Sequence, residues 1–425
     1  MNLAQNTIWS FASKFVAMIF YMLLDVLLAR ILGVEDYAEW VFFYSVLTML
    51  FYFGWMGINS SVKVFVSKEE NSLNKRYCIT ASVQLRLLYS IIAALIIFFV
   101  APRLSEILGY PDKYKHLQYL MLSSSILVFL NSFSEFFKEL SMGLEKFKML
   151  FCITFLEYGG YFLFVLLFLY ISRSIYGIVW GYVCSGICVV AFGVYILKKY
   201  ILIKKEDFIL SLKRYALPIV KYAVPIAIIS FGGLILIEMD TFMLGILSKK
   251  EDVAVYGIAK NLCSKATHIN YALTVGTMTT FSVFNRKDYA DKIKKFMKVS
   301  NLNLAVTLVI SIVFLVIGPF AINIIYGKQY MEAGRVLRAL TPYYALYGIS
   351  NFYSVFLDFQ GKAKFRSFCY ISIIILNFSL NYILIPIIGA TGAAIATSIS
   401  LIPYTILVVW GTIKSIKRIE AINME

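Results

Sequence analysis

The chain has 425 residues, of which 60% are hydrophobic and only 15% are charged. This composition excludes a soluble globular protein, because such proteins are roughly half apolar and a quarter charged. The 40 lysines and arginines exceed the 24 acidic residues and give a net charge of +16, yet they lie mostly between apolar runs, so we expect no nucleic-acid partner.

Apolar runs long enough to cross a bilayer as a helix recur along the whole chain. The first run has neither the charged start nor the small-residue cleavage site of a signal peptide, so we expect it to be retained. The sequence predicts twelve membrane-spanning helices, at 8–32, 38–62, 79–101, 117–137, 149–171, 175–197, 218–247, 253–283, 300–322, 336–359, 367–385 and 391–412.

The orientation of these helices follows from the distribution of positive charge. The even-numbered connections and the C-terminal segment hold most of the lysines and arginines, for example in "KKYILIKK" and "NRKDYADKIKKFMK". Such segments stay in the cytoplasm. We therefore expect a multi-pass protein with both termini cytoplasmic and its surface in contact with membrane lipids.

Self-similarity divides the chain into two halves. Asp25 corresponds to Asp240 and Pro102 to Pro319, at a nearly constant separation, and a Glu-Asp pair follows each aspartate. We predict an N-terminal six-helix lobe at 1–200, a basic cytoplasmic linker at 201–214 and a C-terminal six-helix lobe at 215–425. An even number of helices per lobe makes them parallel repeats, pseudo-symmetric around a central cleft, as in transporters.

Catalytic and metal-binding motifs are missing from the sequence. It contains no P-loop, H-E-x-x-H or G-x-S-x-G motif, and two histidines make a histidine-based metal site improbable. The six cysteines form no C-x-x-C pair, so we interpret them as reduced packing residues. We expect a protein that is not an enzyme and needs no metal or cofactor.

The order of several loose motifs resembles the MOP superfamily, and most closely the polysaccharide-lipid flippases of the Wzx type. These motifs are "NTIWSFASKFVAMIFYMLLDVLLARILGVEDYAEW", "GLEKFK", "IIYGKQYMEAGRVLRAL" and "GATGAAIATSIS". The resemblance implies two six-helix lobes, alternating access, and undecaprenyl-diphosphate-linked oligosaccharide as cargo in the bacterial inner membrane. It also implies a monomer, with the polysaccharide polymerase machinery as a further partner. Ala38 departs from the glycine that family members commonly show there.

Polar side chains form stripes on single faces of the apolar helices, which predicts a cleft with a net positive charge. A diphosphate would be attracted to such a surface, and sugars would stack on its aromatic rings. For Lys63 and for Arg86, near the expected cytoplasmic ends, a packing role competes with this one. The candidate binding residues are Lys14, Lys63, Lys260, Lys265, Tyr21, Tyr52, His268 and Tyr271.

Asp25 and Asp240 are candidates for ion coupling or gating, since an acid inside an apolar helix is costly; simple helix packing is the alternative. Of the two we favour Asp25, which shares its stripe with Lys14. Pro218, Pro225, Gly232 and Gly233 make the helix at 218–247 the candidate hinge, with a static kink as the alternative.

Two other functions compete with oligosaccharide flipping for O-antigen or other surface polysaccharide synthesis. One is ion-coupled export of small organic cations by a MATE-like protein, but such an exporter should line its cleft with carboxylates. The other is a membrane polymerase or ligase, which would need a long outer loop with catalytic residues. The longest outer connection, around 102–116, is short.

Overall fold

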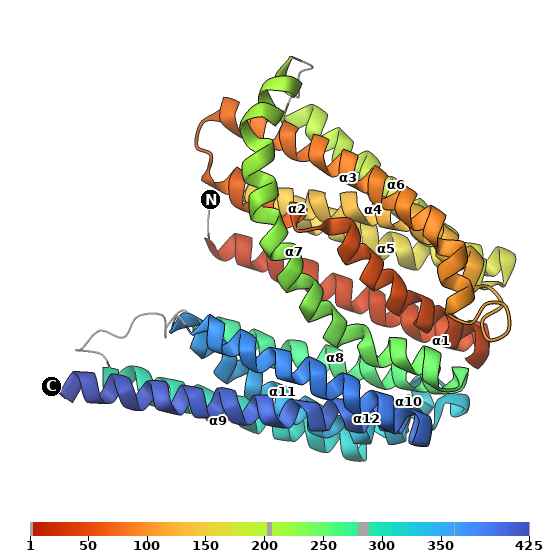
Figure 1. Ribbon diagram of the computed structural model, residues 1–425, viewed down its shortest axis with the longest axis vertical. Helices are drawn as coiled ribbons and strands as arrows, with labels where there is room; N and C mark the ends of the chain where they lie inside the picture. Colours follow the sequence, from red (N-terminus) through yellow and green to blue (C-terminus); the bar gives the residue numbers. More distant parts are fainter. Residues whose placement is uncertain (1–2, 202–205, 279–288, 361, 425) are drawn as a thin grey trace. The chain divides into compact units, whose positions relative to one another are not determined.

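The computed structural model describes the backbone of all residues except 1–2, 202–205, 279–288, 361 and 425. In this described part of the chain all regular secondary structure is helical, as Figure 1 shows in the order of the sequence. The predicted all-α class is therefore confirmed.

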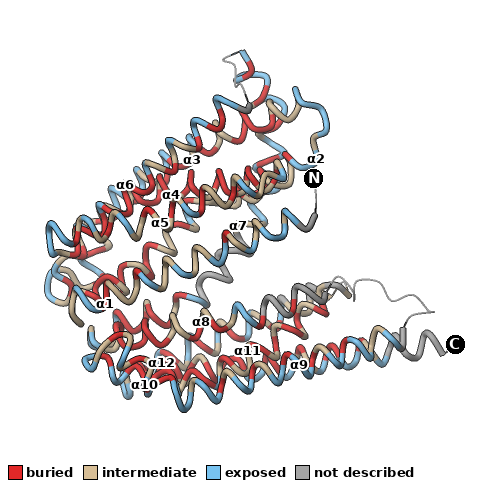
Figure 2. The backbone as a smooth tube through the Cα atoms, turned by 180° about the vertical axis from the view of Figure 1, so that it is seen from behind, coloured by how far each residue is buried: buried red, intermediate tan, exposed pale blue. Residues whose placement is uncertain are grey.

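Large apolar side chains lie on the outside of the helices as well as between them. Phe99 is 76% exposed and Trp410 is 52% exposed, and Figure 2 shows exposed residues along the length of most helices. A water-soluble protein does not expose apolar surface on this scale. The same surface is favourable in lipid, where every backbone polar group must be satisfied inside the helix. The chain is thus a helical membrane protein.

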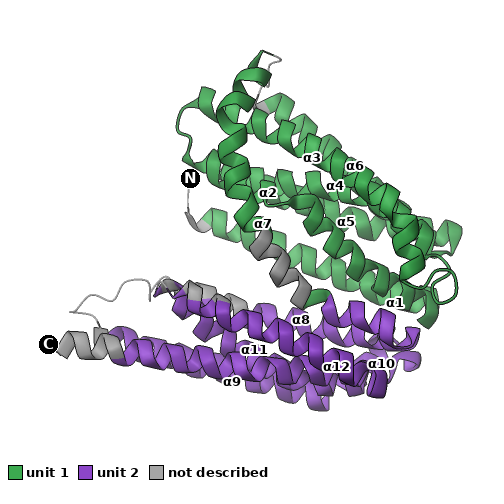
Figure 3. Cartoon of the chain, viewed as in Figure 1, with its two compact units in different colours: residues 1–238 green, residues 239–425 purple. Residues whose placement is uncertain are grey.

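Two compact units make up the chain, an N-terminal unit of Met1–Glu238 and a C-terminal unit of Met239–Glu425 (Figure 3). The helices of the first are α1 (Leu3–Trp55), α2 (Ile58–Lys68), α3 (Ser72–Ile107), α4 (Leu117–Gly143), α5 (Phe147–Ser172) and α6 (Ile175–Ile196), followed by the short π-helix η1 (Leu197–Ile201). Helix α7 (Asp207–Leu247) begins in the first unit and ends in the second. The predicted boundaries at 200 and 215 stay a prediction, and residues 202–205 of the linker lie outside the described part.

The described residues of the C-terminal unit continue with five α-helices and one 3-10 turn. These elements are α8 (Lys250–Met278), α9 (Tyr289–Val316), α10 (Gly318–Ile325), η3 (Lys328–Tyr330), α11 (Ala333–Phe359) and α12 (Ala363–Met424). Within this unit α11 packs against α8, α9 and α12.

Among the described residues, seven helices are long and apolar enough to cross a membrane. Two of them are unusually long, because α1 and α12 each merge two predicted spans across a kink at Gly33 and at Ile388–Gly389 respectively. One crossing needs about 20 residues, so the apolar stretch of 51 residues in α1 has room for two. The number of twelve crossings stays a prediction.

The predicted uninterrupted span at 38–62 is wrong, because the helix breaks between Trp55 and Ile58. Met56 and Gly57 both have a positive φ, of 40° and 70°, which ends α1 and starts α2 in a new direction. A side chain at Gly57 would place its Cβ atom 2.1 Å from the carbonyl oxygen of Ala223 in α7. Glycine is therefore needed here both for the backbone conformation and for the close approach of α7.

We expect Gly57→Ala to lower the free energy of unfolding by roughly 1–3 kcal/mol more than Gly33→Ala does. Both glycines have a positive φ, so both variants lose roughly 1–2 kcal/mol of backbone conformational energy. A Cβ atom at Gly33 meets nothing within 4 Å, so only Gly57→Ala adds a steric clash. Thermal unfolding of the two purified variants in the same detergent measures the difference, and equal melting temperatures would contradict the clash.

Candidate functional site

Arg86 of α3 is fully buried and closes the break between α1 and α2. Its Nη1 donates to the carbonyl oxygen of Trp55 and to Oδ1 of Asn59, both at 3.2 Å, and its Nη2 donates to the carbonyl oxygen of Gly54. Its Nε donates to Oγ of Ser90 at 2.9 Å. The last carbonyl groups of a helix lack donors within the helix, and Arg86 supplies them here. Arg86 therefore has a structural role, because it satisfies buried acceptors at the break between α1 and α2.

A buried cluster of charges lies between α4 and α5 of the N-terminal unit. Nζ of Lys138 lies 2.6 Å from Oε1 of Glu135 and forms a second ion pair with Glu157. Ser134 donates to Oε1 of Glu157 at 2.7 Å, and the Tyr161 hydroxyl donates to the same atom at 3.3 Å. We call Glu135, Lys138 and Glu157 the charged triad. The predicted span at 117–137 ends one residue too early to include Lys138, whereas α4 continues to Gly143 and this lysine is 8% exposed inside it.

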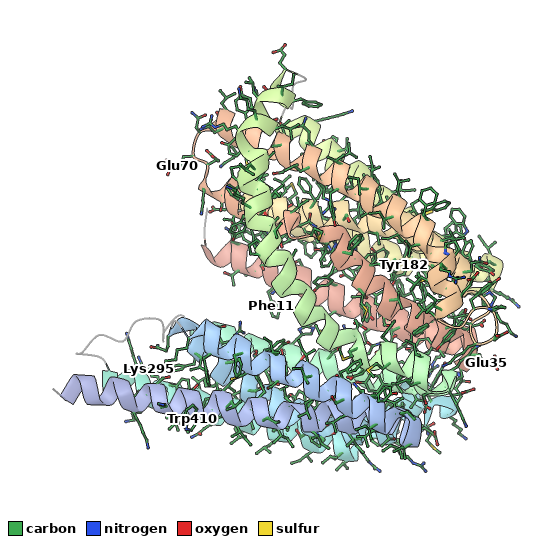
Figure 4. The ribbon with its side chains drawn as sticks, viewed as in Figure 1. Phe11, Glu35, Glu70, Tyr182, Lys295 and Trp410 are labelled. Atoms are coloured by element: carbon green, nitrogen blue, oxygen red, sulfur yellow. The ribbon has the colours of Figure 1, made fainter. Side chains whose placement is uncertain are left out.

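Aromatic rings surround the charged triad. The ammonium group of Lys138 lies 5.3 Å from the ring centroid of Tyr158. The rings of Tyr161 and Tyr182 stack with their centroids 4.2 Å apart, and Trp40 lies 5.5 Å from Tyr182. Tyr182 is 6% exposed and is labelled among the helices of the N-terminal unit in Figure 4. These rings line the buried charges of Lys138 and Glu157, whereas the side chain of Glu135 is 27% exposed.

Asp240 is the centre of a second polar site, within the C-terminal unit. Its Oδ1 accepts hydrogen bonds from Asn377 at 3.1 Å and from Asn381 at 2.6 Å. Its Oδ2 accepts from the hydroxyl groups of Tyr256 and Thr397, both at 2.6 Å. The aspartate is 3% exposed. We call these five residues the Asp240 site.

One acceptor in the Asp240 site lacks a donor. Oδ1 of Asn381 is buried and has no hydrogen-bond partner among the described residues, whereas Oδ1 of Asn377 accepts from Asn381 at 3.0 Å. Buried polar atoms are almost always paired, so this oxygen atom is an exception among the described residues. Together with the carboxylate and two hydroxyl groups, these amides offer the oxygen atoms that hard cations prefer.

Asp25 has a related environment in the N-terminal unit. The hydroxyl group of Tyr37, which follows the kink at Gly33, donates to Oδ1 of Asp25 at 2.9 Å. Tyr256, in the helix after Asp240, makes the corresponding contact in the C-terminal unit. Asp25 is only partly buried, in contrast to Asp240. The two predicted acids therefore share a tyrosine partner and differ in their exposure.

Comparison with known families identifies the chain. Its sequence matches the family model described as "Polysaccharide biosynthesis protein" over residues 3–281, which is more than half of its length. The chain belongs to this family. A second family model, MatE, matches residues 225–383. A search of curated protein sequences found no match.

Solved structures with the same fold as this polysaccharide biosynthesis protein include transporters and a flippase. An inward-facing multidrug resistance MATE family transporter of the MOP superfamily is 13% identical, with a TM-score of 0.78 over 97% of this chain and 99% of that chain. Lipid II flippase MurJ, in an inward closed conformation, is 17% identical, with a TM-score of 0.71 over 99% and 91%. A MOP superfamily transporter from Pyrococcus furiosus is 14% identical, with a TM-score of 0.64 over 98% and 96%. The resemblance to the MOP superfamily is confirmed.

The predicted binding residues of the N-terminal unit occupy different surroundings in this family member. Lys63 forms an ion pair with Glu139 of α4 at 2.8 Å, so a carboxylate already neutralises it. Lys14 is exposed. The rings of Tyr21 and Tyr52 are partly buried and contact the rings of neighbouring residues of α1. A role for these residues in binding cargo stays a prediction.

In the C-terminal unit, Nζ of Lys260 donates to Oγ1 of Thr241 at 3.1 Å, one residue beyond Asp240. Lys265 is partly buried and His268 is exposed on α8. The side chain of Tyr271 lies outside the described residues. Lys260 therefore lies next to the Asp240 site, because its hydrogen-bond partner Thr241 directly follows Asp240 in the chain.

The candidate hinge residues all lie in α7. Pro218 and Pro225 are exposed, and the helix continues through both of them. Gly232 and Gly233 fall in the stretch 228–236, about whose packing nothing is described. A hinge in α7 therefore stays a prediction.

A group of possible metal ligands lies near the start of α4. It comprises Asp36, Glu39 and His116, whose ligand atoms lie within 4.8 Å of one another. Oε1 of Glu39 accepts from the backbone N–H of His116 at 2.6 Å, and Nδ1 of His116 lies 2.9 Å from the Tyr176 hydroxyl. A carboxylate that accepts from a backbone N–H at a helix start stabilises that start. These contacts give Glu39 and His116 structural roles.

Proposed function

We propose that this protein translocates undecaprenyl-diphosphate-linked oligosaccharide repeat units across the bacterial inner membrane, for the synthesis of O-antigen or another surface polysaccharide. The observation that carries this proposal is the match of residues 3–281 to the polysaccharide biosynthesis protein family. The similar fold of lipid II flippase MurJ supports a lipid-linked cargo. On this proposal the protein moves its cargo by alternating access and catalyses no chemical reaction.

The arrangement that we propose in the membrane is twelve crossings in two pseudo-symmetric six-helix lobes around a central cleft, with both termini in the cytoplasm. The kinks in α1 and α12 support this number, because each divides one long helix into two segments of crossing length. The excess of lysine and arginine in the even-numbered connections supports the orientation.

We further propose that a cation bound at the Asp240 site couples to transport. The buried carboxylate of Asp240 accepts hydrogen bonds from four donors, so its negative charge is stabilised where a hard metal cation such as Na⁺ would be attracted to it. The unpartnered Oδ1 of Asn381 supports a metal cation, since it would become a ligand. Asp25 is the weaker candidate because it is more exposed.

A second candidate function is export of small organic cations. The match of residues 225–383 to the MatE family favours it, and so do the carboxylates of the charged triad and of Asp240. This function and oligosaccharide flipping predict different effects when the protein is lost. Loss of an exporter would sensitise cells to cationic drugs, whereas loss of the flippase would stop the delivery of repeat units.

Deletion of the gene in its host tests the proposal. We expect undecaprenyl-linked repeat units to accumulate on the cytoplasmic side and surface polysaccharide to disappear, and the intact gene should restore it. The expression of a MATE drug exporter in the deleted strain serves as a control and should restore nothing. Unchanged surface polysaccharide together with new sensitivity to cationic drugs would overturn the proposal in favour of the second function.

A further inference from the structure

Three side chains that can bind a metal ion lie together at one end of the N-terminal unit. Asp36 and Glu39 follow the kink at Gly33 and, being three residues apart, lie on the same face of α1. His116 is the residue directly before α4. One ligand atom of each side chain lies within 4.8 Å of the other two, and Figure 4 labels Glu35, the neighbour of Asp36, at this end of the unit. Two distant segments of the chain thus bring one imidazole and two carboxylates together.

The distance between Asp36 and His116 fits a shared metal ion better than a direct hydrogen bond. Nε2 of His116 lies 4.0 Å from Oδ1 of Asp36, which is too long for a hydrogen bond. Bonds from Zn²⁺ to nitrogen or oxygen are about 2.0–2.2 Å long, so two ligand atoms of one ion lie at most about 4.3 Å apart. Among the described residues Asp36 makes no hydrogen bond and no other ion pair. Its carboxylate is therefore available to an ion.

The other contacts of His116 and Glu39 orient both side chains and leave each of them a position for an ion. Nδ1 of His116 lies 2.9 Å from the hydroxyl group of Tyr176 in α6, which can accept its hydrogen. Nε2, on the side of Asp36, then has a lone pair for a metal, and such an outer partner is usual for metal-binding histidines. Glu39 is 1% exposed, and its Oε1 accepts from the backbone N–H of His116 at 2.6 Å. A carboxylate has about four acceptor positions, so it can also bind an ion.

We propose that Asp36, Glu39 and His116 bind one divalent transition metal ion such as Zn²⁺. The imidazole favours Zn²⁺ over Mg²⁺ and Ca²⁺, which prefer sites made of oxygen atoms. Two carboxylates and a neutral imidazole carry two negative charges, which a divalent ion balances. Three protein ligands leave one tetrahedral position for water. The ion connects the segment after the kink of α1 with the start of α4 and so stabilises the N-terminal unit.

The site is accessible to ions from the surface. The side chains of Asp36 and His116 are 43% and 27% exposed. They lie in the first and third connections between the predicted spans, which face away from the cytoplasm in the proposed orientation. With a single imidazole, the site differs from the histidine-based site that the sequence makes improbable. Metal binding depends neither on the orientation nor on the transported cargo, so it is tested separately from the proposed function.

Isothermal titration calorimetry with ZnCl₂ tests the site on the full-length protein in detergent, after a chelator has removed bound metals. We expect one Zn²⁺ to bind per chain and to raise the melting temperature, because it binds the folded state. Asp36→Asn and His116→Gln should each weaken binding by more than about tenfold, since the loss of even an outer partner of a ligand costs about 10–100-fold. The matched controls Asp112→Asn and His268→Gln change an exposed aspartate and an exposed histidine and should bind Zn²⁺ as the parent does.

Either of two results would overturn the proposal. One is binding of Zn²⁺ by Asp36→Asn and His116→Gln with the affinity of the parent. The other is a parent protein that binds Zn²⁺ no more tightly than Mg²⁺, which would show that the imidazole is not a ligand. Asp36→Asn removes no hydrogen bond among the described residues, so without metal it should melt at the temperature of the parent. This variant therefore decides the test even if His116→Gln does not fold.

Discussion

Arg86→Ala is expected to lower the free energy of unfolding by about 3–5 kcal/mol, because the buried neutral acceptors that Arg86 satisfies lose their donor. The variant leaves the carbonyl oxygens of Gly54 and Trp55 without their donor inside the membrane domain. Each buried acceptor that loses its donor costs about 1–3 kcal/mol. Thermal unfolding in detergent, followed by intrinsic fluorescence, measures the loss.

Arg103→Ala is the matched control, because Arg103 lies on the same helix and its side chain is 81% exposed. Its ion pair with Glu106 faces solvent, so its loss should change the stability by less than about 1 kcal/mol. Arg86→Lys should fall between the two, since an ammonium group cannot reach all the acceptors of a guanidinium group. Equal melting temperatures of Arg86→Ala and Arg103→Ala would show that the hydrogen bonds of Arg86 are not needed to stabilise the break between α1 and α2.

The class of the protein followed from composition, because hydropathy reports which segments prefer lipid. It does not report where a helix ends. Helix α3 begins at Ser72, about two turns before the predicted span at 79–101, and α4 continues to Gly143. For this reason the predicted span at 117–137 ends one residue before Lys138. Its counter-charges, Glu135 and Glu157, remove the cost that makes a lysine improbable inside a helix bundle.

The repeated aspartates could be found in the sequence, whereas their surroundings could not. An acid inside an apolar run is visible as a local anomaly, and both Asp25 and Asp240 were identified in this way. Asn377, Asn381 and Thr397 lie more than a hundred residues after Asp240 and come from α12. Only the packing of the helices brings them together. We therefore favour Asp240 over Asp25 as the ion-coupling residue, because Asp240 accepts hydrogen bonds from four side chains and is more buried.

The Asp240→Asn variant is expected to reduce ion-driven flipping of lipid-linked oligosaccharide at least about tenfold. An amide keeps the size of the side chain but removes the charge, and a hydrogen bond to a charged group contributes about 1.5–3 kcal/mol. A loss of 1.4 kcal/mol already corresponds to a factor of ten in an equilibrium constant. The measurement uses the purified protein in proteoliposomes, with a pH gradient and a Na⁺ gradient imposed separately, so that the two cations are distinguished.

Two controls separate coupling from folding in this experiment. Asp112→Asn changes an exposed aspartate of the connection before α4 and should flip at the parental rate under both gradients. Asp25→Asn tests the acid in the N-terminal unit and should keep most of its activity, because that carboxylate is more exposed. The Asp240→Asn protein should still unfold cooperatively, although at a lower temperature than the parent, because Tyr256 and Thr397 can donate to its amide oxygen whereas its amide nitrogen faces the donors of Asn377 and Asn381. If Asp240→Asn responds to both gradients as the parent does, the repeated acid serves only the packing of the helices.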